Sequence, residues 1–535
     1  MKYNTLKYDY PSKRNVVFGK KGMVNTSQPL AAQAGLDIMK AGGNAIDAAV
    51  ATAVCMTVLE PTSNGIGSDA FALVWINDEL KGLNASGPSP ELIDPEEIKE
   101  KYGDEIPKRG WVPVTVPGAP SAWVELSEKY GKLPFEKLFE PAIDYAENGF
   151  PLSPTTAELW KNAHAEFKDT FKDEYFKHWF DTFTIDGEVP QSGDMITLKG
   201  HAKTLREIAK TKGESFYNGD LADKIDAFSK ETGGYIRKSD LSKYKPEWVE
   251  PISTDYRGYT VSEIPPNGQG ITTLMALNIL ENYEFTERDT TDTFHKQMEA
   301  MKLAFVDARE YVTDPKSMSV TNEELLSKKY AKERQQLISD EALTPQYGDP
   351  SRGGTIYLST ADEEGNMVSF IQSNFMGFGS GVVVPGTGIS LQNRGNNFTL
   401  DPTKDNYLQP NKKPFHTIIP GFLSKDGKPV GPFGVMGGFM QPQGHLQVIM
   451  NTVDFHMNPQ QALDAPRWQW VGGKQIEVER AFPYEITKEL IAMGHEIKIL
   501  PNELSMGRGQ IIWKDENGIL HGATEPRADG YVAAW

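Results

Sequence analysis

Cysteine is almost absent from this sequence of 535 residues, which contains only Cys55. A single thiol cannot form an internal disulfide, and it cannot supply a cysteine cluster for a metal ion. Cys55 lies in the most apolar stretch, residues 45–59, which includes Asp47 and is shorter than the roughly 20 apolar residues of a membrane-spanning helix. We therefore expect this stretch in the protein core, where the thiol has a structural role.

Positive charge is also scarce, because 55 lysines and arginines face 73 aspartates and glutamates, which gives a net charge of -18. Nucleic acids and anionic membranes bind to basic surfaces, so the sequence predicts neither as a partner. The first residues, "MKYNTLKYDYPSKRNVVFG", lack the apolar segment of an export signal. We expect a cytoplasmic protein.

Several catalytic and cofactor motifs are missing as well. The chain has no G-x-S-x-G elbow, no Walker lysine and no H-E-x-x-H pair, and its nine histidines show no metal-ligand spacing. "GIGSDA", residues 65–70, fits the glycine pattern of a dinucleotide site, but a predicted helix precedes it and a predicted strand follows it. A dinucleotide site requires the reverse order. Because the other motifs and the histidine spacing are also missing, we expect no metal and no cofactor.

The first part of the chain predicts a pair of helices. Ser27 is the expected N-cap of a helix that Gly42 and Gly43 stop. Asn44 is the expected N-cap of a second helix, which ends before Pro61. The segment "DAFALVWIN" then predicts a short buried strand, and no repeat or long linker divides the chain.

Two glycines, Gly353 and Gly354, precede Thr355 at the start of a predicted β-hairpin formed by "TIYLSTAD" and "MVSFIQSN". Either the glycines form a turn, or they let the backbone bend so that Thr355 attacks the preceding carbonyl and becomes a new N-terminus. In the second case the amine of Thr355, with an ordinary pKa of about 7.7 to 8.0, is the base for its own hydroxyl. The turn-rich "YGDPSRGG" before Thr355 predicts an exposed processing site.

A second glycine pair, Gly437 and Gly438, lies in "VMGGFMQPQGH" between a predicted strand and a predicted helix. Adjacent backbone N–H groups at the start of a helix favour negative charge. The pair is either an oxyanion hole for a tetrahedral intermediate or a tight strand-to-helix connection.

Together these stretches resemble the γ-glutamyltransferase (glutathione hydrolase) family of self-processing N-terminal-nucleophile (Ntn) hydrolases. The resemblance covers nearly the whole chain. Five segments carry it, in the order and spacing of that family: "GMVNTSQPLAAQAGLDIMKAGGNAIDAAVATA", "VLEPTSNGIGSDAF", "VTVPGAPSAWVELSEKYGKLPFEKLFEPAIDYAENGFPLS", "GGTIYLSTADEEGNMVSF" and "HGATEPRADG".

The resemblance implies a four-layer αββα sandwich and autocatalytic cleavage between Gly354 and Thr355. The large fragment, 1–354, and the small fragment, 355–535, are expected to interleave as one domain. They are therefore expected to form a heterodimer, either alone or within a higher oligomer.

The resemblance also implies roles for four residues. Thr355 aligns with the catalytic nucleophile, and Ser373 aligns with a threonine that hydrogen-bonds the nucleophile. Gly437 and Gly438 align with the oxyanion-hole pair, which agrees with the interpretation from their position before a helix.

This sequence departs from the family pattern where the substrate binds. Ser86 stands where typical members have the arginine that binds the donor carboxylate, and a serine cannot form a bidentate charged pair. Asn396 and Asn397 replace the acidic pair that holds the donor ammonium group. His416 and Thr417 replace two serines beside the donor.

Arg394 is an additional positive charge near these positions. It either binds a carboxylate of the substrate or forms a surface or intersubunit ion pair. The sequence predicts an amidohydrolase or acyltransferase that transfers an acidic acyl group to water or to an amine. The acyl group is γ-glutamyl, or glutaryl as in the cephalosporin-acylase-like branch. A slow, promiscuous amidase and an unprocessed, non-catalytic relative that binds a small acid also fit the sequence.

Overall fold

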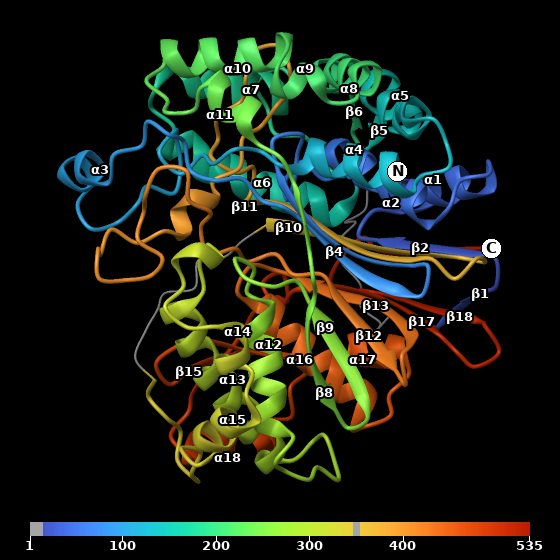
Figure 1. Ribbon diagram of the computed structural model, residues 1–535, viewed down its shortest axis with the longest axis vertical. Helices are drawn as coiled ribbons and strands as arrows, with labels where there is room; N and C mark the ends of the chain where they lie inside the picture. The colour runs from blue at the N-terminus through green and yellow to red at the C-terminus, as the bar shows by residue number, and fades with distance from the viewer. Residues whose placement is uncertain (1–13, 346–353) are drawn as a thin grey trace.

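Two large antiparallel sheets lie face to face in the computed structural model, which describes residues 14–345 and 354–535. Helices cover the outer face of each sheet, so the layers run helix, sheet, sheet, helix from the top to the bottom of Figure 1. This arrangement confirms the predicted αββα sandwich.

The first sheet has seven strands in the spatial order β19 (Tyr531–Ala534), β2 (Gly22–Thr26), β10 (Gly354–Asp362), β11 (Met367–Phe375), β3 (Asp69–Ile76), β4 (Glu79–Ala85) and β7 (Glu247–Val249). The second also has seven, in the order β1 (Val17–Gly19), β18 (Leu520–Thr524), β17 (Arg508–Lys514), β13 (Lys428–Met436), β12 (Gly421–Lys425), β9 (Tyr259–Glu263) and β8 (Ile252–Tyr256). Two smaller sheets contain β14 (Trp468–Gly472), β15 (Gln475–Val478) and β16 (Glu496–Ile499), and β5 (Phe150–Pro151) and β6 (Met195–Ile196).

The helices on the side of the first sheet are α1 (Pro29–Lys40), α2 (Ala45–Leu59), α3 (Pro95–Tyr102), α4 (Ala119–Tyr130), α5 (Glu140–Asn148), α6 (Pro154–Thr170), α7 (Lys177–Phe183), α8 (Lys199–Thr211), α9 (Glu214–Tyr217), α10 (Asp220–Glu231) and α11 (Lys238–Lys243). Those on the side of the second sheet are α12 (Gly270–Leu280), α13 (Thr291–Tyr311), α14 (Asn322–Leu325), α15 (Lys328–Gln335), α16 (Met440–Val453), α17 (Pro459–Asp464) and α18 (Tyr484–Ala492). Short 3-10 helices are η1 (Phe135–Phe139), η2 (Glu174–Phe176), η3 (Pro315–Ser317) and η4 (Arg394–Asn397).

Both sheets contain strands from each side of the Gly354–Thr355 bond. In the first sheet β10 pairs with β2, and β11 pairs with β3. In the second sheet β12 pairs with β9, and β18 pairs with β1. Separation of the two expected fragments therefore requires the rupture of strand pairing in both sheets.

The predicted helix pair is present as α1 and α2, with one difference at its start. Asn44 caps α2 as predicted, because its side chain accepts hydrogen bonds from the N–H groups of Ile46 and Asp47. The prediction of Ser27 as the cap of α1 is wrong: Gln28 holds the cap position, and Ser27 Oγ donates to Glu60 instead (2.6 Å). Cys55 is fully buried in α2, and burial raises the pKa of its thiol.

Strand β10 separates its side chains between two hydrophobic clusters. Ile356 and Leu358 pack against the helices outside the first sheet, whereas Tyr357 and Ala361 pack between the two sheets. Successive side chains of a strand point to opposite faces. Thr355 therefore shares the inner face with Tyr357, at the start of a central strand.

Some predictions fall on residues outside the described ranges. Gly353 and the preceding residues of "YGDPSRGG" belong to them, as do the first 13 residues of the chain. Across residues 14–345 and 354–535, no helix combines the length and apolar character that crossing a membrane requires.

Candidate active site

Thr355 lies at an irregularity between β10 and β11. Gly354 pairs with Phe375 and Ile356 pairs with Gln372, so two residues of β11 lie opposite Thr355. Such β-bulges redirect side chains and are frequent beside active sites. The hydroxyl of Ser373 lies in hydrogen-bond contact with the hydroxyl of Thr355 (2.9 Å), and both residues are fully buried.

Arg394, at the start of η4, joins this pair. Its Nη2 donates to Ser373 Oγ (3.1 Å), and its Nη1 donates to Thr417 Oγ1 (2.5 Å). The guanidinium carbon lies 4.5 Å from the centre of the Phe375 ring. Phe375 adopts a left-handed backbone conformation, with φ +74°, which is uncommon for a bulky side chain. The strained residue thus places an aromatic face against the cation.

Arg394 is fully buried, which does not fit the alternative of a surface ion pair. Among the residues that the structure describes, no carboxylate forms an ion pair with Arg394, and its Nε has no hydrogen-bond partner. Burial lowers the pKa of Arg394 to about 9, opposed by the charge of Asp69, so the guanidinium is protonated at neutral pH. A buried cation whose hydrogen-bond partners are neutral is costly unless an anion pairs with it.

His416 is hydrogen-bonded to Asp69 rather than to Thr355. Its Nδ1 accepts from the N–H of Ile418 (3.4 Å), so Nε2 carries the proton and donates to Asp69 Oδ2 (2.9 Å), and both side chains are fully buried. Burial is the main reason that the pKa of His416 is well below its usual range, and the charge of Arg394 adds to it. Burial also raises the pKa of Asp69 to about 7, although Arg394 and the N–H groups of Gly87 and Gly118 lower it.

Gly437 and Gly438 connect β13 to α16 with left-handed φ values of +143° and +61°. Glycine adopts such angles without steric cost. Within residues 14–345 and 354–535, no acceptor binds the N–H of either glycine. Gln269 Nε2 donates to the carbonyls of both Thr417 (2.6 Å) and Gly438 (2.9 Å). A continuous chain of hydrogen bonds therefore links the glycine pair to Thr417 and, through Arg394, to Ser373.

Two predicted binding residues are not joined to this group. Ser86 Oγ donates to Asn84 Oδ1 (2.7 Å) and accepts from Asn267 Nδ2 (3.2 Å), so its hydroxyl belongs to a separate buried network. Asn397 contributes its backbone carbonyl to Asn406 Nδ2 (2.6 Å). Neither side chain has a hydrogen bond to Thr355, Ser373, Arg394 or Thr417 in the described part of the chain.

A cavity of about 800 Å³ adjoins the group on the side of Gly437. Met376, which follows the end of β11, and Met440 line it together with the 62–63 and 108–109 segments. Arg109 ties one wall to the loop after β11, because its Nη1 donates to the carbonyl of Gly377 (2.8 Å). Gly437, one of the two predicted oxyanion-hole glycines, therefore lines the cavity. Residues from both sides of the Gly354–Thr355 bond form its walls.

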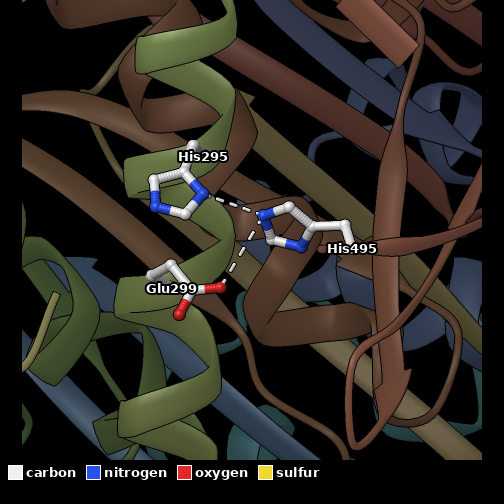
Figure 2. A group of neighbouring side chains, drawn as sticks. All are labelled: His295, Glu299 and His495. Atoms are coloured by element: carbon white, nitrogen blue, oxygen red, sulfur yellow. Dashed lines mark hydrogen bonds and ion pairs between the residues drawn. The ribbon is translucent and has the colours of Figure 1, made fainter. Parts of the chain in front are cut away.

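Two histidines that are far apart in the sequence, His295 and His495, lie together in the fold. Figure 2 shows His295 and Glu299, one turn apart on α13, directed toward His495. His295 Nε2 donates to the carbonyl of Ser339 (2.7 Å), so its Nδ1 accepts from His495 Nε2 (2.8 Å). Lys302 Nζ lies 2.6 Å from Glu299 Oε1 and 3.5 Å from His495 Nδ1.

Two imidazoles and a carboxylate are typical ligands of a zinc ion. Here, however, the ammonium of Lys302 is already the cation that pairs with the carboxylate of Glu299. Its ammonium and the carboxylate of Glu299 are both fully buried, and burial lowers the pKa of Lys302. Burial, together with Lys302, lowers the pKa of His495 to about 3, so the imidazole is neutral. The cluster is a satisfied polar network that holds residues 339–343, since Glu299 Oε2 also accepts from the N–H of Leu343 (2.9 Å).

Replacement of Lys302 by methionine tests this assignment. The change leaves the carboxylate of Glu299 buried without its cation, which we expect to cost about 3 to 5 kcal/mol of unfolding free energy. The midpoint of urea unfolding measures the loss. The double variant Glu299→Gln with Lys302→Met removes both charges and is expected to recover most of it. A single variant as stable as the wild type would contradict the assignment.

A threonine at the start of a central strand, on the inner face of one of two stacked sheets with helices outside, is the arrangement typical of Ntn hydrolases. Known structures share this fold. The crystal structure of a cephalosporin acylase from Bacillus halodurans aligns with a TM-score of 0.97 and 61% identity, covering 100% of this chain and 99% of that one.

The chain belongs to the γ-glutamyltranspeptidase family. The family model described as Gamma-glutamyltranspeptidase matches residues 31–535. The glutathione hydrolase-like YwrD proenzyme of Bacillus subtilis is 39% identical over 525 residues, which are 96% of this chain and 98% of that protein. The oxamate amidohydrolase proenzyme of Klebsiella pneumoniae is 32% identical, with 96% and 98% covered. The protein is therefore an Ntn hydrolase, and the alternative of a non-catalytic relative loses its support.

Proposed function

We propose that the chain is a self-processing amidohydrolase in which cleavage of the Gly354–Thr355 bond releases the amine of Thr355. The contact of 2.9 Å between the hydroxyls of Thr355 and Ser373 is the observation that carries this proposal. It places the predicted nucleophile beside a polar partner on the inner face of the sheet. After cleavage the two fragments stay associated as a heterodimer, because strand pairing in both sheets holds them together.

In the proposed mechanism the amine of Thr355 takes the hydroxyl proton while Oγ1 forms a bond to the amide carbon of the substrate. The N–H groups of Gly437 and Gly438 stabilise the oxyanion, a contribution worth about 2.7 to 4 kcal/mol per donor. The carbon–nitrogen bond then breaks, and the amine of Thr355 passes the proton to the leaving nitrogen. Water attacks the resulting acyl ester, which releases the acid and restores the hydroxyl. An amine acceptor in place of water gives acyl transfer.

The substrate in this proposal is an amide of an acid that carries a second carboxylate. Arg394 supports it as a buried cation without an anionic partner among the described residues. Asn397 and the neighbouring Asn396 provide no negative charge for a donor ammonium group. A γ-glutamyl group held through its carboxylate fits this site, and so does a glutaryl group, which has no ammonium.

The test of the proposed function uses purified wild-type protein on a denaturing gel. We expect fragments of about 39 and about 20 kDa, in proportion to their shares of 535 residues and 59.4 kDa. The smaller one should begin with the sequence T-I-Y-L-S. The same sample should hydrolyse glutaryl or γ-glutamyl p-nitroanilide. An active sample that runs as one intact band contradicts the proposal.

A further inference from the structure

Asp69, which the mechanism above does not use, lies directly opposite Ser373. The two residues are partners in the antiparallel pairing of β3 with β11. Partners across an antiparallel pair point to the same face of the sheet and lie close together. Asp69 therefore shares the inner face with Ser373 and, across the bulge, with Thr355. It is fully buried, so its carboxylate is shielded from solvent.

His416 fixes the direction of this carboxylate. Its Nε2 donates to Asp69 Oδ2 (2.9 Å), and its ring lies against Phe71 with the ring centres 4.7 Å apart. The backbone of His416 is held as well, because its N–H donates to the carbonyl of Asn267 (2.9 Å) and its carbonyl accepts from the N–H of Gln269 (2.9 Å). The imidazole therefore has little freedom to release Asp69.

Asp69 and Arg394 influence each other without contact. Each charge stabilises the other, yet in the described part of the chain they form no ion pair within 4.0 Å. Nε of Arg394 lacks a partner in the same residues. An arginine that paired directly with Asp69 would have its hydrogen-bonding edge filled. The observed arrangement gives Arg394 a nearby counter-charge and keeps donors available for a ligand.

We propose that Asp69, held away from Arg394 by His416, is a specificity-determining residue that couples binding of the substrate carboxylate to uptake of one proton. The inference rests on the proposed binding of that carboxylate by Arg394. A second anion next to an ionised Asp69 is repelled in this buried site, so the carboxylate binds best when Asp69 carries a proton taken from solvent. The site then selects a singly charged carboxylate over a dianion such as a phosphate.

Other groups around Asp69 do not account for such a coupling. The charged and titratable side chains that influence it or feel its charge are those of Arg394, Lys413, His416, Tyr217 and Tyr244. Burial raises the pKa of both tyrosines and lowers that of His416, so these three stay neutral near pH 7. Asp69, with a pKa of about 7, is the group whose charge changes there.

The experiment compares two p-nitroanilides of similar size, one with a glutaryl group and one with an uncharged valeryl group, on processed wild-type enzyme. For the glutaryl substrate we expect KM to rise toward a limit of about tenfold per pH unit above pH 7. For the valeryl substrate KM should change little. The released amine of Thr355 titrates in the same range, but it affects both substrates alike, so their ratio isolates Asp69.

The Asp69→Asn variant should abolish the rise in KM for the glutaryl substrate between pH 7 and pH 8.5. His416→Leu, which cannot donate to Asp69, should raise KM for the glutaryl substrate at pH 6.5 because the carboxylate can then pair with Arg394. Self-cleavage on a gel reports that each variant folds. Asp69→Asn with the wild-type pH dependence overturns the inference, whereas wild-type enzyme that hydrolyses neither glutaryl nor γ-glutamyl p-nitroanilide overturns the proposed function.

Discussion

The Thr355→Ala variant should remain a single chain of full length and should hydrolyse neither glutaryl nor γ-glutamyl anilides. Alanine has no hydroxyl to attack the carbonyl of Gly354, so the acyl shift that opens the chain cannot start. The variant also lacks the nucleophile for the substrate amide. Loss of processing and loss of turnover are therefore expected together, and a gel and an anilide assay measure them on the same sample.

Two further variants show whether the effect is specific. Thr355→Ser keeps a hydroxyl and should process and turn over, at reduced rates. Thr360→Ala lies on the same strand but loses a different contact, the hydrogen bond from Thr360 Oγ1 to the carbonyl of Ala45 (2.7 Å). It should cost about 1 kcal/mol of stability and still process. Fragments of the expected sizes from Thr355→Ala would place the nucleophile elsewhere.

Local patterns in the sequence predict much of the fold that carries Thr355. The hairpin of β10 and β11, the cap of α2 at Asn44 and the glycine connection before α16 all follow from signals within a few residues. The start of α1 does not. Ser27 is a good capping residue by type, but its hydroxyl binds the buried Glu60, more than 30 positions away. A tertiary contact outweighs the local preference.

The site depends on contacts that no local pattern contains. Asp69 and His416 are separated by 347 positions and meet only because the segment before β12, a strand of the second sheet, lies against β3 of the first sheet. Gln269 reaches Gly438 from the segment before α12. Asp69 stands in "GSDAF", whose glycine pattern is that of a dinucleotide site in the wrong context, and Gln269 stands in "PNGQG", whose spacing indicates no site. Only the arrangement of the sheets brings these side chains together.

Arg394 shows a different limit of the sequence. The sequence indicates that Arg394 either binds a carboxylate of the substrate or forms a surface or intersubunit ion pair. The two interpretations differ in how deeply the guanidinium is expected to be buried. The structure places the guanidinium fully inside the protein, against Ser373 and Thr417. Arginine is rarely buried completely unless it is paired, so this burial is not expected from composition. The partners of Arg394 are Ser373, near the end of β11 in the first sheet, and Thr417, before β12 of the second sheet, so its burial is a property of the whole fold.

Replacing Arg394 by glutamine should lower kcat/KM for the glutaryl anilide by about 100- to 1,000-fold. Removal of one partner of a buried charge pair typically costs 2 to 5 kcal/mol, and here the unpaired partner is the carboxylate of the substrate. Glutamine still donates one hydrogen bond toward Ser373 or Thr417, so the loss should fall mainly on KM. The valeryl anilide, which has no carboxylate, should lose less than about threefold because the nucleophile and the oxyanion donors are intact.

The contrast between the two substrates separates recognition from support of the fold. Arg394→Lys keeps the positive charge but not the planar pair of donors, so it should fall between the wild type and Arg394→Gln for the glutaryl anilide. If both anilides lose activity equally in Arg394→Gln, then Arg394 only positions Ser373 and Thr417, and the carboxylate of the substrate binds elsewhere. If self-cleavage fails as well, the guanidinium is needed before any substrate arrives. The expected result is a processed variant that has lost its preference for an acidic acyl group. The neutral valeryl group has no carboxylate to pair with the guanidinium, so loss of the charge at position 394 affects only the acidic substrate.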